Sequence, residues 1–100
     1  MIRGTTPTHV FTLPFDVSVI KTAKVIYSQR GEVVLTKCGD DLRMEGNEIR
    51  LTLSQENTLS FTCTDNVSIQ LRVLTTANDA LASDIMIISV ARCLEDEVLT

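Results

Sequence analysis

Few residues of this chain are able to do chemistry, and the first is its single histidine, His9. A Ser-His-Asp or Cys-His arrangement would have to be built from this residue, which lies near the start of a predicted strand. A catalytic base also needs a positioned nucleophile and a third group that orients it. We therefore interpret His9 as a side chain on the face of a strand.

Three cysteines, Cys38, Cys63 and Cys93, are the candidate thiols. Their odd number and wide spacing fit neither a disulfide framework nor a C-x-x-C metal site. Nothing nearby in the sequence supplies the cationic neighbourhood that activates a thiol, and free cysteines commonly fill apolar space. We expect unpaired cysteines that pack in the interior, and synthesis in a reducing cytosol.

Two acidic runs, Asp40 with Asp41 and Glu95 to Glu97, offer oxygen ligands. Calcium needs roughly six or more ligands at set offsets around a glycine turn, so both runs are expected to be solvated. The sequon Asn66-Val67-Ser68 opens a predicted core strand in a chain without a secretory signal, and we treat it as chance. The motifs G-x-S-x-G and H-E-x-x-H and a phosphate-binding glycine loop are missing. We predict no enzyme, no cofactor and no metal.

The elements that would position a site are predicted from hydrophobic alternation. Apolar and polar residues alternate strictly over residues 48–54, and a compact polar turn follows. A second alternating strand begins at Val67, with Leu74 as an apolar exception on its outer face. The segment from Asp84 to Arg92 is apolar on both faces, which is typical of a strand covered on both sides.

Short strands at intervals of roughly 8 to 12 residues, separated by turn residues, predict an all-β antiparallel sandwich of about seven strands. A small barrel is the alternative. One inward face per strand should form the core. The predicted core residues are Phe11, Val25, Tyr27, Ile49, Leu51, Leu53, Ile69, Leu71, Val73, Ile85 and Ile87.

Length and charge limit the remaining choices. A chain of 100 residues fits one domain, residues 1–100, with a flexible or edge-strand lead-in at 1–7 and a tail at 95–100 that is solvated or ordered by a partner. A net charge of −4 with interspersed signs argues against nucleic-acid binding. The longest apolar run, Ile85 to Ile88, is far too short to span a membrane, so we expect a soluble, cytoplasmic protein without membrane contact.

One feature indicates partners. The two apolar faces of the segment from Asp84 to Arg92, together with Leu74, form more apolar surface than a small sandwich readily covers. A fully buried central strand is one interpretation. The other is a contact with a second copy or a partner, and we then expect Leu74, Met86 and Ile88 to lie near it.

Several stretches resemble a known family. They are Arg3–Thr8 with Phe11–Pro14, Leu53–Phe61, Val67–Val73, and Ser83–Val90 with Leu94–Leu99. Together they cover nearly the whole chain and are similar to small uncharacterised prophage-encoded proteins of gut Firmicutes. Those proteins resemble, more distantly, the N-terminal immunoglobulin-like module of phage baseplate upper proteins, in which the sandwich docks onto the virion and supports receptor-binding components. Baseplate upper proteins are longer than this chain.

The resemblance implies an immunoglobulin-like sandwich without catalytic residues, acting as a structural or assembly part of a phage tail or baseplate. Its partners would be other phage structural proteins and, in a homo-oligomer, copies of itself. It would be made in the bacterial cytoplasm and reach the virion if assembled. The alternative function is an accessory binding module whose loops, chiefly residues 75–83 and 39–48, bind a protein or a carbohydrate.

Overall fold

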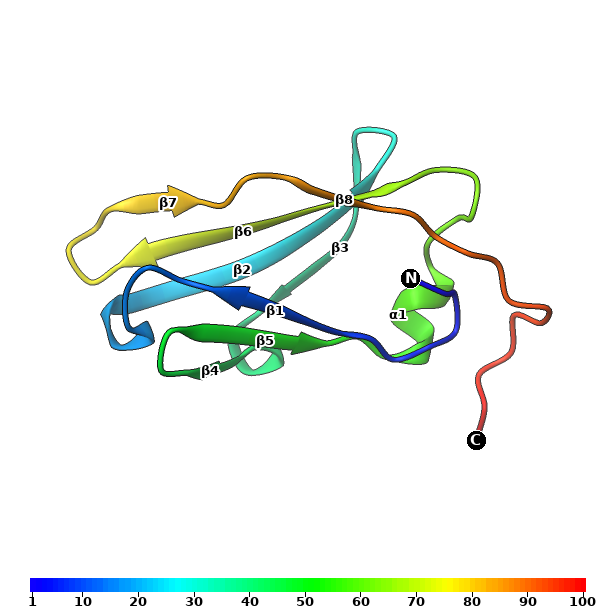
Figure 1. Cartoon of the computed structure of the whole chain (residues 1–100), viewed down its shortest axis with the longest axis horizontal. Coiled ribbons are helices and arrows are strands. Elements are labelled where there is room, and N and C mark those ends of the chain that lie inside the picture. Colours follow the sequence, from blue (N-terminus) through cyan, green and yellow to red (C-terminus); the bar gives the residue numbers. More distant parts are fainter.

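The computed structural model describes every residue from 1 to 100 and shows two antiparallel sheets (Figure 1). The strands are β1 (Thr8–Thr12), β2 (Ile20–Gln29), β3 (Glu32–Cys38), β4 (Arg43–Glu45), β5 (Glu48–Thr52), β6 (Val67–Thr75), β7 (Ala80–Ala82) and β8 (Met86–Ile88). One sheet has the order β1-β5-β4; the other has the order β3-β2-β6-β7, with β8 also paired to β6. The predicted all-β sandwich is confirmed, with eight strands.

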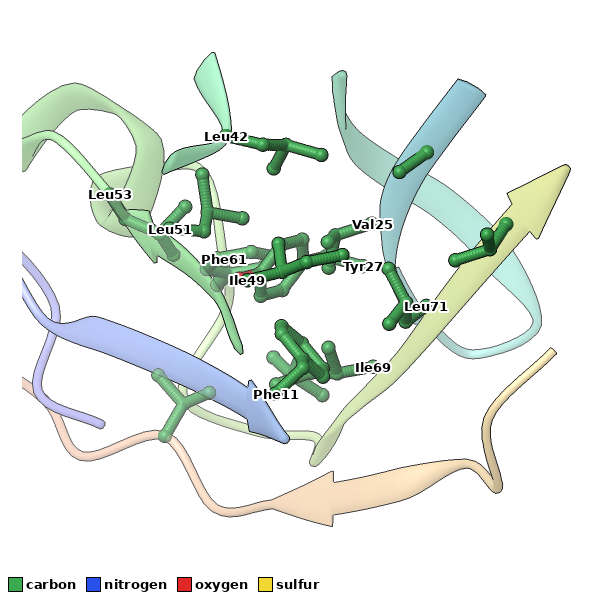
Figure 2. Packing of buried hydrophobic residues seen from close by; sticks show 14 residues of the cluster. Phe11, Val25, Tyr27, Leu42, Ile49, Leu51, Leu53, Phe61, Ile69 and Leu71 are labelled. Atoms are coloured by element: carbon green, nitrogen blue, oxygen red, sulfur yellow. The ribbon is translucent and has the colours of Figure 1, made fainter. Parts of the chain in front are cut away.

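The core fills the space between the two sheets (Figure 2). Every predicted core residue except Ile85 and Ile87 is buried. The prediction succeeded because alternation in β2, β5 and β6 sends every second side chain inward. The core also contains five residues that were not among the predicted core residues: Ala23, Leu42, Phe61, Val67 and Val90.

The hairpin between β2 and β3 turns through Arg30 and Gly31. Both residues have positive φ angles, 55° and 76°, which a two-residue hairpin loop matched to the strand twist requires. Glycine adopts this conformation freely, whereas Arg30 does so at a cost. The Arg30 side chain bonds to the Asp65 carboxylate at 2.5 Å. A second hairpin joins β4 and β5.

The polar turn predicted after β5 is a short helix, α1 (Gln55–Leu59). Ser54 and Asn57 form a capping box, in which the Ser54 hydroxyl accepts from the Asn57 backbone N–H and the Asn57 side chain accepts from the Ser54 backbone N–H. The Thr58 hydroxyl donates to the Thr5 carbonyl at 2.8 Å, which joins α1 to the chain before β1. The helix thus packs against the start of the chain, and Phe61 follows it into the core.

The last strand differs from its prediction. It covers Met86–Ile88 rather than the segment from Asp84 to Arg92, and the predicted loop before it contains β7. Ile87 pairs with Ser68 and Met86 pairs with Ile69. Residues directly opposite in an antiparallel pair point to the same face, so Met86 faces the core side and Ile87 faces outward.

The core assignment of Ile85 and Ile87 is therefore wrong. These side chains are 59% and 66% exposed. Side chains alternate between the two faces of a strand, so an assignment that is off by one residue exchanges all inner and outer side chains. In a segment with apolar residues on both faces, alternation cannot show which set faces inward.

Residues near the two ends of the chain meet beside α1 (Figure 1). The Met1 ammonium group donates to the Ser89 carbonyl at 2.9 Å, and Ile2 forms a parallel bridge with Ala91. The Arg3 guanidinium donates to three acceptors: the carbonyls of Leu59 and Phe61 and the carboxylate of Asp96. Arg3 thus links the first residues of the chain to the end of α1 and to the segment 95–100.

Candidate contact surface and polar hollow

The predicted contact residues do not form one surface. Leu74 lies half-buried on the outer face of β6, where it pairs with Thr22 and Ala80. Met86 and Ile88 pair with the opposite end of β6, and Ile88 packs against the core. A contact role for these three side chains stays a prediction, but any shared contact would have to span the length of β6.

Four of the exposed apolar side chains instead lie along one edge of the larger sheet. We define the β7–β8 edge by Leu81, Ile85, Met86 and Ile87, all exposed. Strands β7 and β8 both pair with β6 on one side and have no strand on the other. Unpaired backbone groups of an edge strand can bond to a further strand, and the apolar side chains beside them add buried area when it does.

An apolar hollow of about 350 Å³ adjoins β7. Its apolar walls come from Leu13, Pro14 and Phe15 after β1, from Leu71 and Val73 of β6, and from Leu81 of β7. Because Leu81 belongs to both features, the hollow is continuous with the β7–β8 edge. An apolar side chain of a docking partner could enter it.

His9 is held by a buried tyrosine. Its Nδ1 lies 2.7 Å from the Tyr27 hydroxyl, and Tyr27 is fully buried. Burial, and secondarily the positive charge of the Met1 ammonium group, lower the pKa of His9 from its ordinary value of 6.5. Burial also raises the pKa of Tyr27. A neutral imidazole that accepts from a neutral phenol fits both directions, and it gives His9 a structural role on its strand.

This pair predicts a loss of stability in mildly acidic solution. The folded-state pKa of His9 lies below 6.5, so the unfolded chain binds more protons as the pH falls through that value. The free energy of unfolding should fall as the pH drops below about 7.5, and it should be insensitive to His9 above that pH. Urea unfolding at each pH measures the effect. His9→Gln should flatten this part of the profile, and an unchanged slope would contradict the assignment.

The cysteines are all unpaired, and Cys38 and Cys63 are exposed while Cys93 is partly exposed. The interpretation of Cys38 and Cys63 as interior packing residues is therefore wrong. Cys38 ends the edge strand β3, and Cys63 lies in the connection between α1 and β6, so neither position faces the core.

A second hollow, of about 410 Å³, is lined only by polar residues. We call it the polar hollow: Thr8, Asp40, Asp41, Arg43, Arg50 and Thr52. Arg43 and Arg50 are direct cross-strand partners, and the hydroxyls of Thr8 and Thr52 lie 2.8 Å apart. Arg50 bonds to Glu48 at 3.0 Å, but no ion pair joins either arginine to Asp40 or Asp41.

The polar hollow was not foreseen as a unit. The sequence placed Arg50 and Thr52 on an outer face, but only strand pairing brings Arg43 and Thr8 beside them. Two guanidinium groups, two carboxylates and two hydroxyls can together bind a ligand rich in hydroxyl and carboxylate groups. No group of histidine, cysteine, aspartate or glutamate side chains in the structure is arranged to hold a metal ion.

Comparison with known proteins gives the fold a name. No family model matches the chain, and no curated protein matches it. Among solved structures, the chain is similar to the Ig-like domain of mouse leukocyte-associated immunoglobulin-like receptor 1, which was solved as a strand-swapped dimer. The sequences are 12% identical, the alignment covers 90% of this chain and 83% of that chain, and the TM-score is 0.50. The fold is immunoglobulin-like.

The V domain of amphioxus IgVJ-C2 also aligns with this immunoglobulin-like chain, at 12% identity over 91% of this chain and 95% of that chain, with a TM-score of 0.35. The two antiparallel sheets and the likeness to the receptor domain confirm the predicted immunoglobulin-like sandwich, whereas the prophage and baseplate assignment stays a prediction. The α-helix of this immunoglobulin-like domain is five residues long, and the structure contains no helix with the length and apolar character needed to cross a membrane.

Proposed function

We propose that the chain is a non-enzymatic contact module, a structural or assembly component of a phage or prophage particle, placed in its tail or baseplate. The support in the sequence is the resemblance described above. Its partners are other structural proteins of the particle, with a second copy of the chain as a further partner. The chain is made in the bacterial cytoplasm and enters the virion on assembly.

The observation that carries the contact role is the exposure of the β7–β8 edge. Ile85 and Ile87 point into solvent beside backbone groups that have no strand partner. Small soluble proteins rarely leave apolar side chains next to an open sheet edge, because such an edge favours pairing with another chain. A permanent neighbour in a particle would cover this edge.

The test compares two exposed apolar residues on the outer face of the same sheet. Ile87→Lys places a charge on the β7–β8 edge, whereas Val33→Lys places it on β3, at a side chain that is 64% exposed. Burying a lysine at a contact is costly, and exposing it is not. We expect mass spectrometry of purified induced particles to find the wild-type chain and Val33→Lys, and to find Ile87→Lys depleted. Particles without the wild-type chain, although it is present in the lysate, would overturn the proposal.

A second function, an accessory binding module, is favoured by the polar hollow. Asp40, Asp41 and Arg43 lie within residues 39–48, one of the two loops expected to present a binding surface. Arginine side chains donate hydrogen bonds to carboxylates, and aspartate and threonine side chains form hydrogen bonds with sugar hydroxyls. An oligosaccharide that contains uronic acid is therefore the probe of choice.

NMR titration with this oligosaccharide should shift the amide signals of the polar hollow. Arg43→Ala should weaken binding about tenfold, the loss expected for one charge-assisted hydrogen bond. The matched control is Arg92→Ala, an exposed arginine outside the hollow. Signal shifts that do not depend on Arg43 would remove this candidate.

A further inference from the structure

The segment Asp96–Leu99 lies against the α1 end of the molecule as a bound peptide would. The Gln55 side chain makes two hydrogen bonds to the backbone of Leu99: its Nε2 donates to the carbonyl at 3.1 Å, and its Oε1 accepts from the N–H at 2.7 Å. Arg3 bonds to the Asp96 carboxylate at 2.5 Å. A paired amide contact to the backbone and a charge contact three residues away define a recognition site for an extended acidic segment.

The receptor side of this contact is fixed by the fold. We call it the cradle: Arg3 and Gln55. Arg3 is held by the carbonyls of Leu59 and Phe61, and its side chain is mostly covered. Gln55 is the first residue of α1, whose start is fixed by the capping box of Ser54. The cradle therefore keeps its geometry whether or not the segment occupies it.

The occupying segment is held much less firmly. The chain is anchored up to Ala91 by its hydrogen bonds to Met1 and Arg3, and beyond that point it is almost entirely exposed. Leu94 is 95% exposed and Leu99 is 72% exposed. Exposed polar contacts are individually weak, and two leucines that remain in water add no stabilisation. The segment is thus free to leave the cradle, since little apolar burial opposes its release.

We propose that the cradle is an interface between copies, in which the Asp96–Leu99 segment of one chain occupies the cradle of a second chain. The hydrogen bonds and the ion pair that the segment makes within one chain are the same contacts that it makes in the cradle of the second chain. Reciprocal exchange re-forms the same bonds twice and allows the leucines of the two exchanged segments to pack together, which they cannot do within one chain. This interface is distinct from the β7–β8 edge and does not depend on a role in a particle.

The first test is association of the purified chain. Sedimentation across a wide concentration range should show a reversible dimer. Gln55→Ala and, independently, Asp96→Asn should each weaken dimerisation about tenfold, because each removes a contact from both cradles. The matched controls are Glu56→Ala and Glu97→Gln. Glu56 is next to Gln55 but makes no bond to the Asp96–Leu99 segment, and Glu97 is next to Asp96 but makes no bond to the cradle. Circular dichroism checks that each variant is folded.

The second test shows which chain occupies the cradle. In a mixture of isotope-labelled and unlabelled protein, a filtered nuclear Overhauser experiment detects only contacts between different chains. We expect a signal between the Gln55 side-chain amide of one chain and Leu99 of another. A strict monomer at every concentration, or a dimer unaffected by both Gln55→Ala and Asp96→Asn, would overturn the proposal. These results concern purified protein alone, so they do not decide whether the chain enters a particle.

Discussion

Replacing Phe61 with alanine should lower the free energy of unfolding by about 3 to 5 kcal/mol, the range for deleting a large aromatic side chain from a close-packed interior. Phe61 is fully buried, and its ring centroid lies 5.8 Å from that of Tyr27. The substitution removes apolar burial, leaves a cavity and breaks an aromatic pair.

Urea unfolding followed by circular dichroism measures this loss. The control is Phe15→Ala, because Phe15 lines the open apolar hollow and is only partly buried. We expect a clearly smaller shift of the midpoint for Phe15→Ala, with a similar slope against denaturant for both variants. Equal effects of the two substitutions would mean that Phe61 is not the interior residue that the structure shows.

Leu51→Ala should lower the free energy of unfolding by about 2 to 5 kcal/mol, because the leucine side chain is buried on the central strand of the smaller sheet and its removal leaves a cavity. The matched control is Leu94→Ala, which makes the same chemical change at a side chain that is almost wholly in solvent. The free energy of unfolding of Leu94→Ala should be within about 0.5 kcal/mol of the wild-type value.

The measurement is the unfolding midpoint of each purified variant in the same denaturant series. A Leu51→Ala midpoint close to that of wild type would show that β5 is oriented with its other face inward. Loss of Leu51 also removes the side chain directly opposite His9. The variant is therefore best measured near neutral pH, where His9 is neutral.

The success of the core prediction in β5 and β6 has a simple cause. In these strands every outer position except Leu74 is polar or charged, as at Arg50 and Arg72, so only one set of side chains is suited to the interior. In the segment around β8 both sets are apolar, and Ile85 and Ile87 were assigned to the wrong side. Which face is covered there depends on pairing with β6, a contact distant in the sequence.

The position of Phe61 was missed for another reason. Alternation ends at β5, and the polar residues that follow indicated a turn. The helix start was signalled by Ser54 followed by Asn57, a variant of the capping box in which asparagine replaces the usual glutamate or glutamine. Recognising this pattern would have predicted α1, and Phe61 is the first apolar residue after that helix ends.

The candidate site was less predictable than the fold. The apolar character of both faces of the chain around β8 was visible in the sequence, but only Met86 of the three predicted contact residues lies on the exposed β7–β8 edge. The polar hollow joins residues from β1, β4 and β5 and from the turn before β4, so it exists only after those strands have paired. A site assembled from several strands leaves no local spacing to detect.

The junction of the two ends of the chain also bears on how the domain folds. The bond from Met1 to Ser89 joins residues 88 positions apart, and the bond from Arg3 to Asp96 joins residues 93 apart. Closing so large a loop is entropically costly unless the intervening chain is already compact. The junction should therefore form after the β2–β3 hairpin, and it should be the first part of the native molecule to open. The amides of Arg3 and Ala91, which bond across it, should exchange with solvent through local opening while the core between the sheets stays closed.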